Sequence, residues 1–199
     1  SVDAYRYLLA SKDRLLRAYL ISFVVTLIGT ITSVSITTLL AYPLSKRDLP
    51  GRNFISFMIF FTMLFNGGLI PTYLVYSQTF HIKDTLWALI VPNLLMNGFS
   101  VILVRTYLTT NIPLDILDAA EIDGASQLRI FISIVLPMSL PILATVGFMT
   151  GLAYWNDWQN GLYYLVRRID LFTIQNLLNR IQSSADALKN STANDMFAQ

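Results

Sequence analysis

The chain has 199 residues and a formal net charge of +2; 54% of its residues are hydrophobic and 13% are charged. Soluble domains carry roughly 25% charged residues, so the composition argues against a soluble helical bundle, and the small net charge gives no reason to expect a nucleic-acid partner. Cysteine is absent, which excludes a disulfide framework, a thiolate metal site and a cysteine nucleophile.

The charged residues are unevenly spread along the chain. Asp, Glu, Lys and Arg are missing from four runs, namely 18–45, 53–82, 85–104 and 130–156. A membrane-spanning helix needs about 20 mainly apolar residues, and every run reaches that length. The sequence therefore predicts an all-α integral membrane protein with four full spans and amphipathic helices at its ends.

The N-terminal segment, residues 1–17, interleaves apolar side chains such as Leu8 with basic ones such as Arg17. This pattern predicts an amphipathic helix that lies along the bilayer surface. The first span follows at about 19–42. Its many serine and threonine residues allow close helix–helix approach, so we expect it to pack against other helices.

The second span, about 54–76, contains Asn66-Gly67-Gly68 near its middle and Pro71 just after them. Two glycines and a proline at membrane depth predict a broken or kinked helix there. The third span is expected at about 85–108. It contains Pro92, Asn93, Asn97 and Gly98.

A long polar break, residues 109–129, separates the third span from the fourth. Pro113 suits the first turn of a short helix in this break. The fourth span is expected at about 136–156, after an approach helix, and it ends in Tyr154-Trp155-Asn156-Asp157-Trp158, an aromatic cluster typical of a membrane–water interface. Leucine and isoleucine at helical spacing predict an amphipathic tail helix over 171–190.

Charge favours one orientation of these spans without fixing it. The loop 44–53 holds three basic residues and one acid, which favours the cytoplasm. Four spans then place 109–129 in the cytoplasm and put 1–17, 77–84 and 159–199 outside. The basic residues of 1–17 and the pair Arg167-Arg168 count against this orientation.

The polar break carries the most specific motif of the chain. It reads Asp118-Ala119-Ala120-Glu121-Ile122-Asp123-Gly124-Ala125-Ser126-Gln127, and Phe131, Pro137 and Pro141 follow it. This stretch resembles the cytoplasmic coupling motif of ABC-type importer permeases, with Asp118 in place of the usual first glutamate. The resemblance makes 109–135 the cytoplasmic coupling segment.

Other stretches resemble the carbohydrate branch of the same family, between Tyr19 and Trp158. Ala41-Tyr42-Pro43-Leu44-Ser45 looks like the family's first cytoplasmic turn, and the Asn66–Tyr73 stretch looks like that of permeases for complex oligosaccharides. The cluster from Tyr154 to Trp158 is typical of sugar permeases. The implied fold is a type I ABC importer transmembrane domain. That fold ordinarily has one more span at each end, so we expect the chain to be a fragment lacking the first and last spans.

The resemblance implies a multi-pass subunit of the bacterial inner (plasma) membrane, set in the lipid bilayer, with no catalytic centre and no cofactor of its own. In the family, such a permease pairs with a second permease above two ATP-binding subunits, which hold ATP and magnesium. An extracytoplasmic sugar-binding protein delivers the sugar. Each permease inserts its short acidic helix into a cleft of one ATPase, and closure of the ATPase dimer opens the outward path.

The coupling residues implied by the motif are Asp118, Ala119, Ala120, Glu121, Asp123, Gly124 and Ala125. We expect the alanines to keep the helix slim enough for a cleft, and Glu121 and Asp123 to pair with basic side chains there. Gly124 permits a sharp change of direction. Apolar anchors are expected at Leu117, Ile122 and Leu128. The competing interpretation is a solvated loop helix with ordinary surface charges.

The candidates for the sugar path are amides and aromatic side chains, because sugars stack on rings and bond to amides and carboxylates in a concave site. They are Asn66, Asn93, Asn97, Tyr154, Trp155, Asn156, Asp157 and Trp158. Asparagine can equally join helices, and tryptophan can equally anchor a helix at the interface. The 154–158 cluster could also touch the binding protein.

Rival classes find less support in the sequence. An enzyme would need a nucleophile or a metal set, but the chain has no cysteine and a single histidine, His81, and it has no phosphate-binding loop for ATP hydrolysis. The alternative function is a secondary transporter or channel subunit without an ATPase partner. A secondary transporter usually places an ionisable residue within a span, and the four runs contain none before Asp157.

Overall fold

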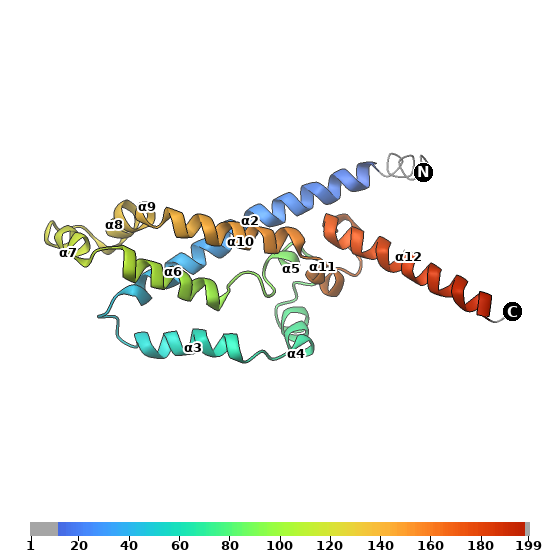
Figure 1. The fold of residues 1–199 in the computed structure, drawn as a ribbon, viewed down its shortest axis with the longest axis horizontal. Coiled ribbons are helices and arrows are strands. Elements are labelled where there is room, and N and C mark those ends of the chain that lie inside the picture. Colours follow the sequence, from blue (N-terminus) through green and yellow to red (C-terminus); the bar gives the residue numbers. More distant parts are fainter. Residues whose placement is uncertain (1–11, 198–199) are drawn as a thin grey trace. The chain divides into compact units, whose positions relative to one another are not determined.

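The computed structural model describes residues 12–197, with side chains up to residue 187, and this part of the chain is helical (Figure 1). The elements are α2 (Lys12–Ser45), α3 (Arg52–Leu64), α4 (Leu69–Leu74), the π-helical turn η1 (Val75–Thr79), α5 (Trp87–Ile90), α6 (Gly98–Asn111), α7 (Leu114–Ile122), α8 (Gln127–Ile130), the π-helical turn η2 (Phe131–Val135), α9 (Leu136–Met138), α10 (Leu140–Asn156), α11 (Gln159–Tyr164), the 3-10 turn η3 (Ile169–Leu171) and α12 (Ile174–Phe197).

Helix α2 is the longest element, and it contains the whole of the predicted first span. The predicted surface helix 1–17 lies largely outside the described residues. Its described part, 12–17, is the beginning of α2 and not a separate helix, which corrects that prediction. These residues are mostly leucine, arginine and lysine, which favour helix, and no proline interrupts α2 before Pro43.

The four predicted spans are not all single helices in the described residues. Within the described residues, α2 alone is a single helix long and apolar enough to cross a membrane. Two further spans exist only if each of two bent pairs is counted as one: α3 with α4 and η1, bent by 112°, and Gln127–Met138 with α10, bent by 76°. The fourth predicted span, 136–156, therefore corresponds to α10 preceded by a bend.

The predicted break in the second span is present. Phe65 ends α3 in an extended conformation, and Gly68 has a φ of +86°, which favours glycine. The side-chain oxygen of Asn66 accepts a hydrogen bond from the Gly68 N–H at 2.9 Å. The asparagine and the glycine together form the turn between α3 and α4.

The structure divides the third predicted span, 85–108, between two helices. Helix α5 ends at Ile90 and α6 begins at Gly98. Pro92 has no N–H to donate within a helix, and Asn93 adopts a φ of +64°. Asn97 then caps a new helix. The proline and the asparagines inside this run therefore interrupt the helix, although the run contains no charged residue.

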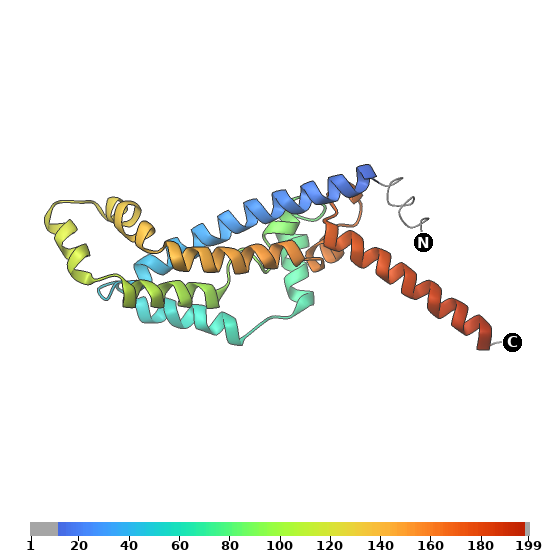
Figure 2. The same ribbon diagram turned by 45° about the horizontal axis from the view of Figure 1, so that its top comes forward.

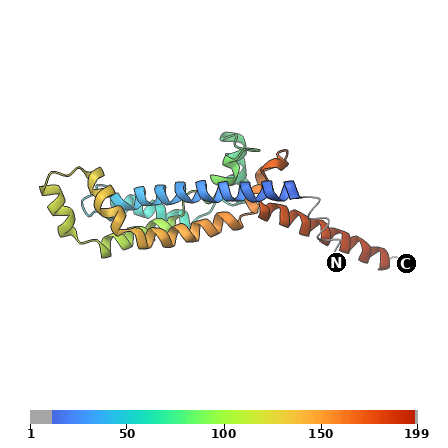
Figure 3. The same cartoon turned by 90° about the horizontal axis from the view of Figure 1, so that it is seen from above.

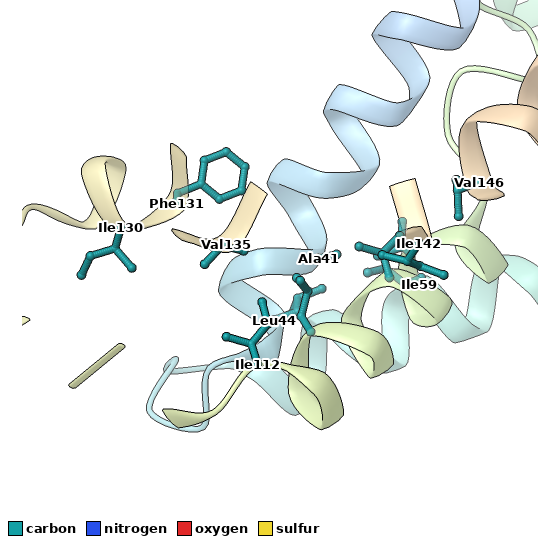
Figure 4. Close-up of a cluster of buried hydrophobic side chains, with 12 residues drawn as sticks. Ala41, Leu44, Ile59, Ile112, Ile130, Phe131, Val135, Ile142 and Val146 are labelled. Atoms are coloured by element: carbon teal, nitrogen blue, oxygen red, sulfur yellow. The ribbon is translucent and has the colours of Figure 1, made fainter. Parts of the chain in front are cut away.

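The described residues form two compact units. One comprises Ile28–Leu69 and Asn93–Leu152, and its core joins α2, α3, α6, η2 and α10 (Figure 4). Helices α3 and α6 lie side by side in this unit (Figures 1 and 2). The buried core residues are Ala41, Leu44, Ile59, Val101, Val104, Leu108, Ile112, Ile130, Phe131, Val135, Ile142 and Val146.

The other unit contains the described parts of 1–27, 70–92 and 153–199. The first turn of α12 packs on the beginning of α2 through Ile174, Leu177 and Ala18, and the Ile174 N–H donates to the Ser22 hydroxyl at 2.8 Å. The predicted tail helix, 171–190, corresponds to α12. Its beginning is therefore a packed part of this unit.

Asp84 joins the loop before α5 to the loop after α11, both in the unit that contains α12. Its Oδ1 accepts hydrogen bonds from the backbone N–H groups of Val166 (2.7 Å), Arg167 (2.8 Å) and Arg168 (3.3 Å), while its own N–H donates to the Tyr164 carbonyl at 3.0 Å. The hydrogen bond from Arg167 is the largest cause that holds the pKa of Asp84 below its ordinary value, against an opposing effect of burial. The charged form of Asp84 thus stabilises this loop pair.

We expect Asp84→Ala to lower the free energy of unfolding by about 1–2 kcal/mol, because three N–H groups lose a charged acceptor that water replaces only in part. Since the folded-state pKa is lowered, this stabilisation is present above the ordinary value of about 3.9 and is lost as pH falls through the folded value. Thermal unfolding in detergent at neutral and acidic pH measures both effects. Asp186→Ala removes an exposed carboxylate of α12 as the control; equal losses from both variants would contradict the prediction.

Candidate functional site

The predicted short helix of the polar break is α7, which lies between α6 and α8 as a separate helix in all three views (Figures 1, 2 and 3). Pro113 immediately precedes it with φ −62° and ψ 132°. This extended conformation separates α7 from α6, so the two helices run in different directions. Asp115 lies in the first turn, where a negative charge interacts favourably with the helix dipole.

The end of α7 is a glycine turn. The Ala125 N–H donates to the Ala120 carbonyl and the Gly124 N–H donates to the Glu121 carbonyl, both at 3.0 Å. This pair of bonds is the Schellman pattern, which requires a left-handed residue just after the helix. Gly124 has a φ of +78°. The sharp change of direction predicted at Gly124 is therefore present.

Helix α7 has an inner and an outer face. Leu117, Ala120 and the following Ala125 are partly buried against the core of the unit. Two of the three alanines thus allow α7 to lie close to its own chain; that they also keep it slim enough for a partner's cleft stays a prediction. The outer face is exposed; it consists of Asp118, Ala119, Ile122 and Asp123.

Apolar side chains are exposed around this outer face. Ile122 is 86% exposed and Leu128 is 66% exposed. Of the three predicted apolar anchors, these two are open to a partner, and Leu117 is used within the chain. Such large apolar side chains beside carboxylates are a feature of docking surfaces when they gather in one place.

Glu121 points toward the end of α2. Its Oε1 lies 3.3 Å from the Lys46 Nζ and accepts a hydrogen bond from the Gln127 amide at 2.6 Å. The Gln127 carbonyl oxygen accepts from Lys46 and, at 3.2 Å, from the Tyr42 hydroxyl. The hydrogen bond from Gln127, followed by those from Lys46 and the charge of Lys46, lowers the pKa of Glu121. The carboxylate expected to meet a partner's basic residue is paired here within its own chain.

Sequence reasoning did not anticipate the roles of Lys46, Gln127 and Tyr42. Tyr42 and Gln127 belong to the two stretches that carried the resemblance, the first turn and the coupling motif, and Lys46 directly follows the first of them. The sequence feature that could have indicated this pairing is the opposite charge of the basic loop 44–53 and the acidic helix α7. That feature could not select Lys46 over Arg47 or Arg52.

The three asparagines of the predicted sugar path lie at breaks of the backbone. The Asn97 side chain caps α6, accepting from the N–H groups of Phe99 at 2.9 Å and Ser100 at 3.4 Å. Asn66 bonds within the α3–α4 turn, and Asn93 supplies a left-handed residue. Their local roles account for their presence in an apolar run. Contact with a sugar remains a prediction for all three.

The cluster from Tyr154 to Trp158 belongs to the other unit. The buried Tyr154 hydroxyl donates to the Ile90 carbonyl at 2.8 Å, and Asp157 Oδ1 accepts from the N–H groups of Gln159 (3.1 Å) and Asn160 (3.4 Å) at the start of α11.

The neighbouring cluster members face α12. The Asn156 side-chain oxygen accepts from the Gln175 amide at 3.4 Å, and the Trp158 carbonyl accepts from the Asn176 amide at 3.1 Å. Trp155 and Trp158 are half-buried. Most polar groups of the cluster thus hold α10, α11 and α12 together.

Among the described residues, no group of three or more His, Asp or Glu side chains is placed to hold a metal ion. The features that gather in one place are the exposed face of α7, its glycine turn and the polar contacts of Glu121.

Comparison with known proteins identifies the family. A family model described as the binding-protein-dependent transport system inner membrane component matches residues 7–158. From Bacillus subtilis (strain 168), the polygalacturonan/rhamnogalacturonan transport system permease protein YtcP is 44% identical over 83% of this chain and 56% of its own length. Protein LplC of the same organism is 38% identical over 83% of this chain and 55% of its own length.

A solved structure agrees with these relatives. A chain of a bacterial ABC transporter involved in the import of the acidic polysaccharide alginate superposes with a TM-score of 0.78 at 27% sequence identity, covering 89% of this chain and 64% of that one. The present chain spans about half the length of the curated relatives named here. The match of the family model to residues 7–158 and the identity to these relatives establish that the chain belongs to the family of binding-protein-dependent transport system inner membrane components.

Proposed function

We propose that the chain is the membrane-spanning permease part of an ATP-driven, binding-protein-dependent sugar importer, and that α7 couples ATPase closure to opening of the translocation path. The observation that carries this proposal is the outer face of α7. Asp118 and Asp123 flank Ile122, which is 86% exposed, on a helix whose other face packs into the core. A helix held on one side and open on the other is suited to docking.

The proposed substrate is an oligosaccharide. The name of YtcP refers to polygalacturonan and rhamnogalacturonan, and the similar solved transporter imports the polysaccharide alginate. Both names concern polymers of sugars, which a transporter meets as oligosaccharide fragments or chains. Binding within the chain is proposed for the amides Asn66, Asn93 and Asn97 and for the cluster 154–158, whose aromatic rings are of the kind on which sugars stack.

The proposed assembly contains a second permease, two ATP-binding subunits and an extracytoplasmic sugar-binding protein, in the bacterial inner membrane. The name of the family, an inner membrane component of a binding-protein-dependent system, supports these partners. ATP and magnesium belong to the ATP-binding subunits in this proposal. The permease chain itself performs no chemical step; its residues supply a docking helix and a path.

We expect Ile122→Lys to weaken the hold on the ATP-binding subunits by about tenfold or more, since a buried apolar anchor of an interface typically contributes over 1 kcal/mol. The measurement is co-purification in detergent of the full-length permease, its partner permease and the ATP-binding subunit. Val166→Lys is the matched control, because it changes an exposed apolar residue (61%) of the unit that does not contain α7.

Two results would overturn the proposed function. Equal retention of the ATP-binding subunit by the unchanged protein and Ile122→Lys would show that this face is not the docking surface. Sugar uptake that continues after the ATP-binding subunits are removed would favour the alternative, a secondary transporter or channel.

A further inference from the structure

We propose that Lys46, Gln127 and Tyr42 are positioning residues that tie Glu121 of the coupling helix to the C-terminal end of α2, so that displacement of α7 is passed directly to α2. This inference rests on the proposed function and divides the acids of the motif into two groups. Glu121 points toward the end of α2 and pairs with Lys46, whereas Asp118 and Asp123 lie on the exposed outer face.

The tie joins segments that are far apart in the sequence. Lys46 directly follows α2, and its Nζ lies 3.3 Å from the Glu121 Oε1 at the last turn of α7. The Gln127 side chain lies between them: its amide donates to Glu121 at 2.6 Å, and its carbonyl accepts from both Lys46 and the Tyr42 hydroxyl. All the polar side chains of the cluster are therefore engaged with one another.

Tyr42 anchors this polar cluster to the core of the unit. Its ring centroid lies 5.0 Å from that of Phe131, a buried residue of η2, and the Lys46 Nζ lies 5.3 Å from the Tyr42 ring centroid. The end of α2 and the beginning of η2 thus meet at Tyr42, and the end of α7 is linked to it through Gln127. A displacement of α7 that keeps these contacts would therefore displace the end of α2 as well.

The position of Glu121 within α7 favours a role beyond the stability of that helix. Glu121 lies in the last turn, where a negative charge interacts unfavourably with the helix dipole. Its pairing with Lys46 compensates for this charge. The two side chains are 29% and 46% exposed, and exposed ion pairs add little to the stability of a fold. The cluster is therefore better placed to set the position of α7 than to hold the chain folded.

The chemistry of Gln127 makes a charge exchange testable. A side-chain amide presents an acceptor on one side and a donor on the other. If Lys46 and Glu121 are exchanged, the amide can turn over and still bond to both. The Tyr42 hydroxyl can then accept from the amide instead of donating to it. The doubly exchanged protein should consequently regain the tie that each single variant loses.

The experiment uses the complete transporter, reconstituted in liposomes with the full-length permease, and measures sugar imported per ATP hydrolysed. We expect Lys46→Glu and Glu121→Lys each to lower this ratio by about fivefold or more, the range of typical coupling between sites. The combined variant Lys46→Glu/Glu121→Lys should recover most of the ratio. Arg47→Glu is the matched control, because it makes the same charge change at the next, exposed residue.

The outcomes separate this proposal from the proposed function. If the ATP-binding subunits remain bound but the single variants keep the full ratio, or if the exchange gives no recovery, the tie is not a coupling element. If the unchanged permease holds no ATP-binding subunit, the proposed function fails and this inference fails with it. Thermal unfolding of the single variants is expected to match that of the unchanged protein; a large drop would mean that the cluster serves folding.

Discussion

Replacing Gly124 by valine should abolish sugar uptake while leaving most of the chain folded. Gly124 holds a φ of +78° at the end of α7, a conformation that costs a β-branched residue about 1–3 kcal/mol. Apart from the glycine and its two chain neighbours, no heavy atom lies within 4 Å of a Cβ built at this position, so the effect is conformational and not a clash with another segment. The two hydrogen bonds of the turn would break, and the outer face of α7 would no longer be held in one orientation.

Uptake of radiolabelled oligosaccharide by cells and co-purification of the ATP-binding subunit measure this effect. Gly124→Asn should retain most activity, because asparagine tolerates the left-handed conformation better than other residues. Gly51→Val is a control for strain alone, since Gly51 has a φ of +75° and an equally open surrounding. Full uptake by Gly124→Val, or an equal loss with Gly51→Val, would show that the direction of α7 is not what matters.

The sequence predicted those local structures that depend on a few neighbouring residues. The short helix after Pro113, the glycine turn at Gly124 and the break around Asn66 are all present. Each follows from backbone chemistry, since proline lacks an N–H, and glycine and asparagine tolerate a positive φ. The family resemblance was confirmed by the match to residues 7–158.

Hydropathy alone did not predict the course of the backbone within the apolar runs. A run free of charge was interpreted as one span at 85–108, but the structure divides it between α5 and α6. Hydropathy measures how apolar a segment is. It does not predict that the Asn97 side chain caps the N-terminus of a new helix. Residues 12–17, four of which are charged, continue into α2, although their amphipathic pattern predicted a separate surface helix.

The partners of the side chains in the candidate site could not be predicted from one sequence. Glu121 was assigned to a partner, and the structure pairs it with Lys46, 75 residues away in the chain. Asp157 was assigned to the sugar path, and it caps α11. A motif indicates which residue types gather in one place; the direction in which each points depends on contacts between distant segments.

Adding a single methyl group at Gly161 should destabilise the unit that contains α11 and α12 by about 2–4 kcal/mol, through overpacking and the loss of a buried hydrogen bond. A Cβ at Gly161 would lie 2.8 Å from the Asn176 Nδ2 and 2.9 Å from its Cγ. Asn176 is fully buried, donates to the Trp158 carbonyl and accepts from Arg180. Its side chain therefore cannot turn away without breaking these bonds.

Thermal unfolding of the detergent-purified chain tests this contact, with Gly147→Ala as the matched control. A Cβ at Gly147 would lie 3.8 Å from the Val34 Cγ2, an ordinary contact, so this change should be nearly neutral. The double variant Gly161→Ala/Asn176→Ala should lose less stability than the sum of its single changes, because the second change removes the atoms that clash. Strict additivity, or equal stability of the Gly161→Ala and Gly147→Ala proteins, would mean that α11 and α12 do not meet at this contact.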